Sequence, residues 1–221
     1  MPDTARERIL ERLRRAPRPE PCASDFAVMH RKVHAPEERY PRLRRLMEAV
    51  HAEFLETTAA DWPRAVAAFA EAERFRAVAY GPGTDAAPRL LAAWPANGPR
   101  LVPFDRPIEE CKRELFEDVD AGFTTTLGGL AETGGLILWP SPREPRLLSL
   151  VPPVHLALLD TTRIYDSFWH ALRTERWAER MPPNALLISG PSKTADIEQT
   201  LAYGVHGPKR LVVIAVRDRS A

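Results

Sequence analysis

The sequence has little of three things: cysteine, net charge and long apolar runs. Only two of its 221 residues are cysteines, Cys22 and Cys111, and no CxxC pair occurs. Two thiols so far apart fit a reducing cytoplasm and exclude a disulfide framework. They also fall short of the four thiolates that an iron–sulfur cluster normally needs. We therefore expect this chain alone to bind no such cluster.

Charge and hydropathy narrow the class of protein further. Lysine and arginine together number 31 and aspartate and glutamate 30, which leaves a formal net charge of +1. This balance argues against a nucleic-acid partner and against attraction to an anionic membrane. No apolar run is as long as a membrane span, and the polar N-terminus lacks the apolar core of a signal peptide. We expect a cytoplasmic protein without a membrane span.

The first 60 residues show helical patterns. Thr4 and Glu7 have the spacing of a capping box, and the helix they open ends before Pro17. Apolar residues recur at helical spacing further on and predict a helix over 41–57. We expect residues 1–60 to form a helical arm packed on or beside the core, and residues 61–221 to form the main domain.

From residue 76 onwards, short apolar runs alternate with helical stretches. Strands are expected over 76–80, 100–104, 123–127, 135–139, 154–159, 185–189 and 211–216. The alternation predicts βαβ units and an α/β fold with a Rossmann-like, mainly parallel sheet. Residues 123–159 are the exception, because strands follow one another there without helices. That segment predicts a hairpin or meander inserted in the sheet.

Residues 186–208 contain two glycine- and proline-rich corners, one at each end of a stretch that reads as a helix over 195–203. The backbone N–H groups at the start of such a helix, with a lysine beside them, would hold a phosphate or carboxylate. The candidate substrate-binding residues in the first corner are Gly190, Ser192, Lys193 and Thr194.

An ordinary capped helix is the alternative for this stretch. Ser192 and Thr194 are both good N-cap residues, and Asp196 and Glu198 would fall in the first turn, where they repel an anion. The spacing also matches neither a P-loop nor the dinucleotide-binding glycine pattern.

His206 lies between two glycines in the second corner and is the best placed of the six histidines for catalysis. The alternative is an exposed or backbone-bonded loop histidine. His155, inside an apolar run, is expected to be a core histidine with a hydrogen-bond partner. No HExxH or similar pair occurs, so no metal site is expected.

Glu132 lies in a glycine-rich segment between apolar stretches. A partly buried carboxylate needs a partner or a raised pKa, which makes Glu132 a candidate base or nucleophile. Arg146 is a candidate fixed cation that would pair with Glu132 or bind substrate. The alternative for Glu132 is hydrogen bonding to N–H groups of its own loop.

Three segments together, AETGGLIL at 131–138, RLLSLVPPVHL at 146–156 and ISGPSKTADIEQTLAYGVHGPKRLVVI at 188–214, resemble the LUD-domain family. The resemblance implies a fold of the glucosamine-6-phosphate deaminase, ribose-5-phosphate isomerase and CoA-transferase type. It also implies a part in oxidising L-lactate to pyruvate through a multi-subunit iron–sulfur system. With two cysteines in this chain, the clusters are expected in partner subunits, and the chain would be a non-redox subunit.

Another hypothesis is a stand-alone enzyme or sensor that binds a small anionic metabolite, such as a sugar phosphate, CoA thioester or hydroxy acid. A structural module without a ligand is a third. The lactate-system subunit and the stand-alone enzyme or sensor share one geometric expectation. In both, the corners at 128–135, 189–194 and 204–208 meet in a cleft. We expect that cleft at the carboxyl ends of the parallel strands.

Overall fold

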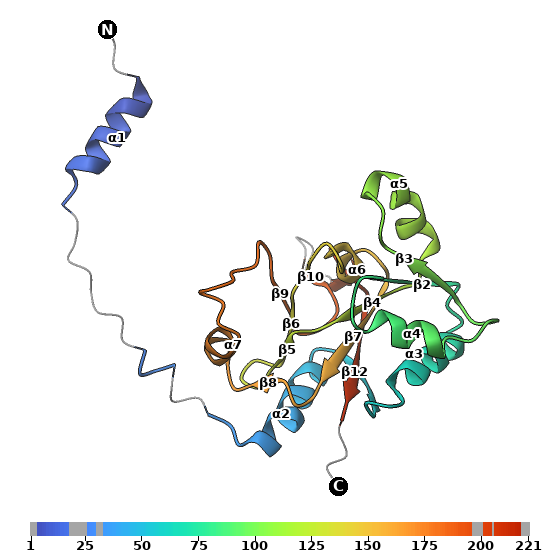
Figure 1. The fold of residues 1–221 in the computed structure, drawn as a ribbon. Coiled ribbons are helices and arrows are strands. Elements are labelled where there is room, and N and C mark those ends of the chain that lie inside the picture. Colours follow the sequence, from blue (N-terminus) through green and yellow to red (C-terminus); the bar gives the residue numbers. More distant parts are fainter. Residues whose placement is uncertain (1–3, 18–25, 30–32, 196–200, 205, 218–221) are drawn as a thin grey trace. The chain divides into compact units, whose positions relative to one another are not determined.

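The computed structural model describes residues 4–17, 26–29, 33–195, 201–204 and 206–217 (Figure 1). The chain divides into two units, Met1–Arg31 and Lys32–Ala221. In the first unit, helix α1 (Ala5–Arg15) begins at Thr4, whose side chain accepts the Glu7 N–H while the Glu7 carboxylate accepts the Thr4 N–H. The capping box expected from the sequence is therefore confirmed.

The second unit is built on a six-stranded sheet in which every neighbouring pair is parallel. In spatial order its strands are β1 (Glu53–Thr57), β12 (Arg210–Val216), β7 (Val154–Asp160), β4 (Ala121–Thr125), β2 (Ala77–Tyr80) and β3 (Arg100–Pro103). The central strands are almost wholly apolar because both of their faces are covered. The expected α/β fold with a mainly parallel sheet is confirmed.

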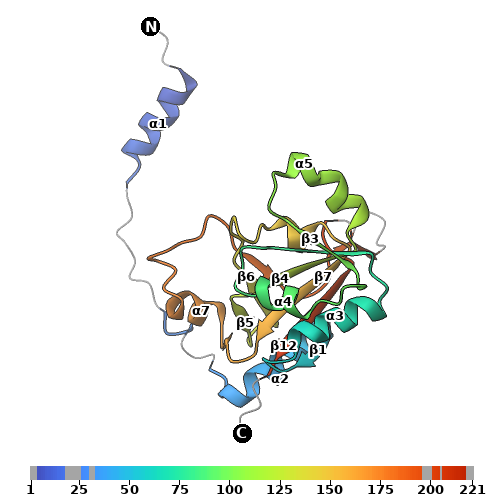
Figure 2. The same ribbon diagram turned by 45° about the vertical axis from the view of Figure 1, so that its right-hand side comes forward.

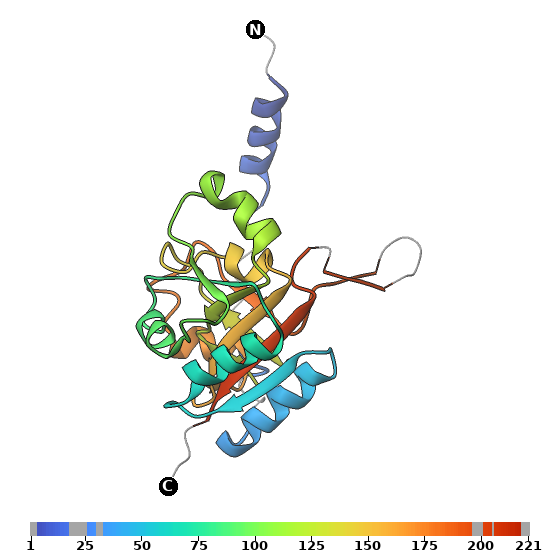
Figure 3. The same cartoon turned by 90° about the vertical axis from the view of Figure 1, so that its right-hand side faces the viewer.

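Helices cover both faces of this sheet. On one face lie α3 (Trp62–Ala72) and α4 (Ala87–Ala93), and on the other lie α2 (Pro36–Glu48), α5 (Ile108–Arg113) with its π-helical continuation η1 (Glu114–Asp118), and α6 (Leu147–Leu150). Figure 3 shows β1 running between α2 and α3. Successive residues of a strand point to opposite faces of the sheet and so enter different hydrophobic cores. In β12, Ile214 packs into the core under α3 and α4, and Val213 packs into the core under α2.

A second sheet packs on the α2 side of the first. Its order is β8 (Ile164–Tyr165), β5 (Gly128–Leu130), β6 (Gly135–Leu138) and β9 (Leu186–Ile188), and β5 and β6 form an antiparallel hairpin. Figure 2 shows this hairpin between the main sheet and α7 (Phe168–Thr174). The expected hairpin is thus confirmed, but it belongs to a separate sheet and is not inserted in the main one.

The helix expected over 41–57 is wrong in its second half. Helix α2 ends at Glu48, His51 has a φ of 70°, and β1 starts at Glu53. The apolar spacing misled because Met47 of the helix and Phe54 of the strand pack into the same cluster.

The helix expected over 195–203 is also wrong in the described residues. β10 (Lys193–Ala195) pairs antiparallel with β11 (Leu201–Tyr203), and 196–200 lie outside the described residues. In Figure 3 these two strands extend away from the body of the unit. Serine and threonine favour turns and strands as well as helix caps, so the local pattern did not decide between them.

Candidate functional site

The carboxyl ends of the parallel strands form a cleft of about 410 Å³. Its walls come from the ends of β4, β7 and β12 and from the starts of α3 and α4. Parallel topology places every strand-to-helix connection at this edge, which is where ligands of α/β proteins bind. Ala59 and Trp62, the first residue of α3, line the cleft, so the N-terminus of that helix lies beside it.

Two arginines line this cleft, and each is held in place. The guanidinium of Arg89 lies 5.3 Å from the centroid of the Trp62 ring and donates to the carbonyl of Ala59. Arg163 donates to the Glu175 carboxylate at 2.8 Å. Fixed guanidinium groups beside a helix N-terminus suit a carboxylate or phosphate.

Hydroxyl groups at the end of β4 complete the cleft. Thr126 donates its hydroxyl to the carbonyl of Leu158 at 2.9 Å. Thr125 donates its backbone N–H and its hydroxyl to the two carboxylate oxygens of Glu144, each at 2.8 Å. Because both hydroxyls already donate, they offer acceptor lone pairs to a ligand hydroxyl. Asp85 and Asp160 line the cleft together with the two arginines.

Glu144 is 9% exposed and lies behind Thr125. Burial raises the pKa of its carboxyl from 4.5 to about 7, although the two hydrogen bonds from Thr125 oppose that rise. The loop that carries Glu144 packs directly on the turn after β2, where a Cβ on Gly81 would lie 2.4 Å from the carbonyl oxygen of Arg143. Sequence reasoning missed Glu144, because nothing in the proline-rich segment 140–145 marks it as buried.

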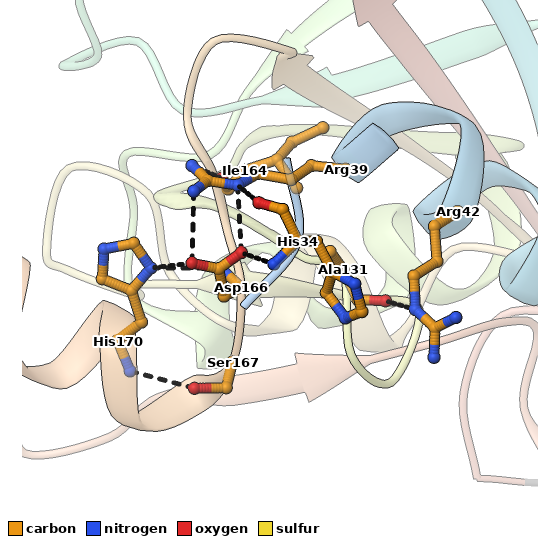
Figure 4. Close-up of polar contacts among 8 residues, drawn as sticks. All are labelled: His34, Arg39, Arg42, Ala131, Ile164, Asp166, Ser167 and His170. Carbon is orange, nitrogen blue, oxygen red and sulfur yellow. Dashed lines mark hydrogen bonds and ion pairs between the residues drawn. The ribbon is translucent and has the colours of Figure 1, made fainter. Parts of the chain in front are cut away.

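A second polar cluster surrounds Asp166, just after β8 (Figure 4). Its carboxylate accepts Arg39 Nε and Nη2, both at 3.1 Å, and the backbone N–H of His34 at 2.8 Å. His170 Nδ1 lies 3.1 Å from Oδ2 and 3.2 Å from the Asp166 nitrogen. A neutral ring accepts that N–H, and a protonated ring pairs with the carboxylate instead.

The Asp166 carboxyl is only 8% exposed, and its partners occupy most of its acceptor positions. The cluster joins α2 and the segment before it to β8 and α7. The backbone of Glu132 adjoins this cluster, because the Glu132 N–H donates to the backbone carbonyl of Asp166 at 2.9 Å. Arg42 of α2 likewise donates to the carbonyl of Ala131 at 2.9 Å. We interpret this cluster as a structural clamp.

The two corners of 186–208 do meet. Ser192 donates its N–H to the Pro208 carbonyl at 2.8 Å and accepts the Gly204 N–H at 3.0 Å. The expected location is wrong, however, because the corners lie where β7 and β12 begin: Lys209 donates its N–H to the carbonyl of Pro153 at 2.8 Å. A parallel sheet has its strand starts and strand ends at opposite edges, so these corners are across the sheet from the cleft.

The glycine-rich corner at 128–135 adjoins the first of these corners. Leu136 pairs with Ile188 across the β6–β9 ladder, and Gly190 sits against the carbonyl of Val50. Lys193 and His206 are exposed, while the side chain of Thr194 lies outside the described residues. The catalytic and binding roles expected for Glu132, Gly190, Ser192, Lys193, Thr194 and His206 stay predictions.

Arg146 is exposed at the start of α6 and follows the Glu144 loop. Its carbonyl accepts the hydroxyl of Ser149 at 2.8 Å, and its expected role as a fixed cation stays a prediction. His155 is confirmed as a core histidine: its Nε2 lies 2.8 Å from the Thr124 hydroxyl, and burial lowers its pKa to about 3.

Among the described residues, no group of three histidine, cysteine, aspartate or glutamate side chains is placed to hold a metal ion. Within that same part of the chain, no helix is both long and apolar enough to cross a membrane.

Comparison with known proteins matches residues 40–216 to the LUD domain. The chain is 40% identical to uncharacterized protein NMB1437 of Neisseria meningitidis over 96% of its own length and 94% of that protein. It is 31% identical to lactate utilization protein C of an Exiguobacterium species, over 58% of each chain. The corresponding protein of Bacillus subtilis is 32% identical over 59% of this chain and 56% of that one, so the matches span little more than half of these relatives.

A solved structure of a DUF162 family protein from Deinococcus radiodurans has the same fold, with a TM-score of 0.61 and 22% identity. The likeness covers 84% of this chain and all of that one.

Proposed function

This chain belongs to the LUD-domain family, and from that premise we propose that it is a non-redox, cytoplasmic subunit of a lactate-utilization system. In this proposal the system oxidises L-lactate to pyruvate, and this subunit binds one or both of these acids in the cleft at the strand ends. The names of the relatives at about a third identity support the pathway.

The observation that carries the ligand proposal is the composition of the cleft. A 2-hydroxy or 2-oxo acid needs a cation for its carboxylate and a hydrogen-bonding group for the neighbouring oxygen. Arg89 and Arg163 supply the first, and the hydroxyl of Thr125 supplies the second. The cleft volume of about 410 Å³ lies within the range usual for small-molecule sites.

Electron transfer is proposed to occur in partner subunits. Cys22 and Cys111 are the only cysteines, and Cys111 is buried within α5. Because a cluster normally requires four thiolates, the iron–sulfur centres of the system would belong to other chains.

Pull-down of the tagged chain from lactate-grown cells tests the partner proposal. We expect iron–sulfur proteins to co-purify with it and deletion of its gene to abolish growth on lactate. If the chain elutes alone and the deletion strain grows normally on lactate, the proposed role is wrong.

Thermal unfolding of the purified chain with L-lactate or pyruvate tests the ligand proposal. A ligand at a hundredfold excess over its Kd stabilises the folded state by roughly 2.7 kcal/mol. Arg89→Gln should lose this stabilisation, whereas Arg113→Gln, on the exposed surface of α5, should keep it. Equal responses of the two variants would remove Arg89 from the site.

A stand-alone enzyme or sensor is the second candidate function. It is favoured by the same cleft, which is roomier than a three-carbon acid requires. Sugar phosphates, CoA thioesters and larger hydroxy acids, screened in the same unfolding assay, separate the two. Stabilisation by one of these and by neither lactate nor pyruvate would replace the first proposal with the second.

A further inference from the structure

We infer that Thr125 and Glu144 form a proton-controlled pair that selects between a 2-hydroxy acid and a 2-oxo acid in the cleft. Ionised Glu144 favours the hydroxy acid, and protonated Glu144 favours the oxo acid. The inference rests on the proposed function, because it takes a small carboxylate to be the occupant of the cleft. No bond of the ligand forms or breaks, and Glu144 takes up one proton from solvent or releases one to it.

The ionised state follows from the hydrogen-bond inventory of the pair. A carboxylate carries no proton, so the hydroxyl hydrogen of Thr125 must point at Glu144 Oε2, 2.8 Å away. The other carboxylate oxygen already accepts the Thr125 N–H. Towards the cleft, Thr125 then offers only lone pairs, which accept a hydrogen bond from the hydroxyl of a 2-hydroxy acid.

Protonation of Glu144 reverses the direction of the hydrogen bond between the Thr125 hydroxyl and the Glu144 carboxyl. The new O–H on Oε2 donates to Oγ1 of Thr125, because Oε1 remains engaged with the Thr125 N–H. The threonine hydroxyl hydrogen is released and can turn towards the cleft that Thr125 lines. It then donates to the carbonyl oxygen of a 2-oxo acid, which has no hydrogen of its own to offer.

The groups around Glu144 keep both its ionised and its protonated form accessible near neutral pH. The elements around the pair carry six charged groups. They are Arg143 and Arg146 on the Glu144 loop, Asp85 before α4 and Arg89 within it, and Asp160 at the end of β7 and Arg163 after it. Burial is the largest cause of the raised pKa of Glu144, and the opposing contributions come from the Thr125 hydrogen bonds. A carboxyl titrating at about 7 changes its charge with small changes of pH or of bound ligand.

Titration calorimetry of the full chain with L-lactate and with pyruvate, at about pH 6 and about pH 8, tests the inference on both sides of the Glu144 pKa of about 7. Both acids stay ionised at both pH values, so their own charge does not change. We expect the ratio of Kd for lactate to Kd for pyruvate to fall by about tenfold from the lower to the higher pH.

Three variants separate the pair from other titrating groups. Glu144→Gln should bind like the protonated state at both pH values, because its amide nitrogen donates to Thr125 while its oxygen accepts the Thr125 N–H. Thr125→Ser keeps the hydroxyl and should keep the pH dependence. Thr125→Val lacks the hydroxyl and should show a ratio that does not change with pH.

Several results would overturn the inference. If both acids bind the wild-type chain with a ratio that is the same at both pH values, the pair does not select between them, although the proposed ligand class stands. If Glu144→Gln keeps the wild-type pH dependence, another group is responsible. If neither acid binds, the ligand proposal and this inference fall together. Should Glu144→Gln not fold, the wild-type ratio and the two Thr125 variants still decide.

Discussion

Ser192 donates its backbone N–H to the carbonyl of Pro208 at 2.8 Å and thereby joins two corners that are distant along the chain. The strands β10 and β11 lie between these corners, and the contact closes the base of their hairpin beside the start of β12. The glycines and prolines there shape a turn-and-hairpin element. The cleft with fixed arginines lies at the opposite edge of the main sheet.

Gly134 and Gly135 form a matched pair for testing how the glycine-rich corner at 128–135 packs on α2. Gly134 has a φ of 67°, and a Cβ there would lie 2.3 Å from Cβ of Leu46, whereas the nearest atom to a Cβ on Gly135 would be 3.5 Å away. Gly134→Ala should destabilise the fold by about 1–3 kcal/mol. Gly135→Ala should change stability by less than about 0.5 kcal/mol in urea denaturation. Equal losses would show that the corner does not pack as described.

Glu144 should make the stability of the fold depend on pH. Its folded pKa is raised from 4.5 to about 7, so its stabilising effect is fully present below pH 4.5 and is lost as pH rises to about 7. The loss across this window is on the order of 3 kcal/mol. Denaturation of the wild type and of Glu144→Gln at a series of pH values should show the variant gaining relative stability as pH rises. Parallel curves would contradict the buried, titrating carboxyl.

The Asp166–Arg39 ion pair should contribute far more than a surface pair. The Asp166 carboxyl is 8% exposed and the Arg39 side chain 23% exposed, so Asp166→Asn leaves a largely buried guanidinium without its counter-charge. We expect a loss of about 3 kcal/mol. Glu117→Gln breaks the exposed Arg113–Glu117 pair and should cost less than about 1 kcal/mol. A double-mutant cycle with Arg39→Met measures the coupling, and a coupling near zero would refute the clamp.

Two truncations test the domain boundary. A chain that starts at Lys32 should unfold at the same temperature as residues 32–221 in the full chain, because these residues form their own unit. A chain that starts at Asp61 should not fold, because it lacks the fully buried Leu43 and Met47 and uncovers the edge of β12. Cooperative unfolding of the shorter chain would support the boundary at residue 60 that the sequence suggested.

The elements that were predictable are those with a local signal. Strands β7 and β12 are covered on both faces, so nearly every position is apolar and the pattern stands out in the sequence. The start of α1 was predictable because Thr4 and Glu7 satisfy each other's N–H groups within one turn. Strand β1 was not predictable because its partner β12 is remote in sequence. Strands β10 and β11 pair with each other locally, and they were missed because their residues also suit a helix.

The sequence by itself determined the family, the parallel α/β architecture and the lack of enough thiolates for a cluster, since these depend on composition, periodicity and contiguous motifs. Only the tertiary structure decided which edge of the sheet holds the cleft and which carboxyl is buried there. Glu144 acquires its shifted pKa from a loop that folds onto Gly81 and the end of β4. Burial of this kind arises from contacts between segments distant in the chain, and no local pattern encodes it.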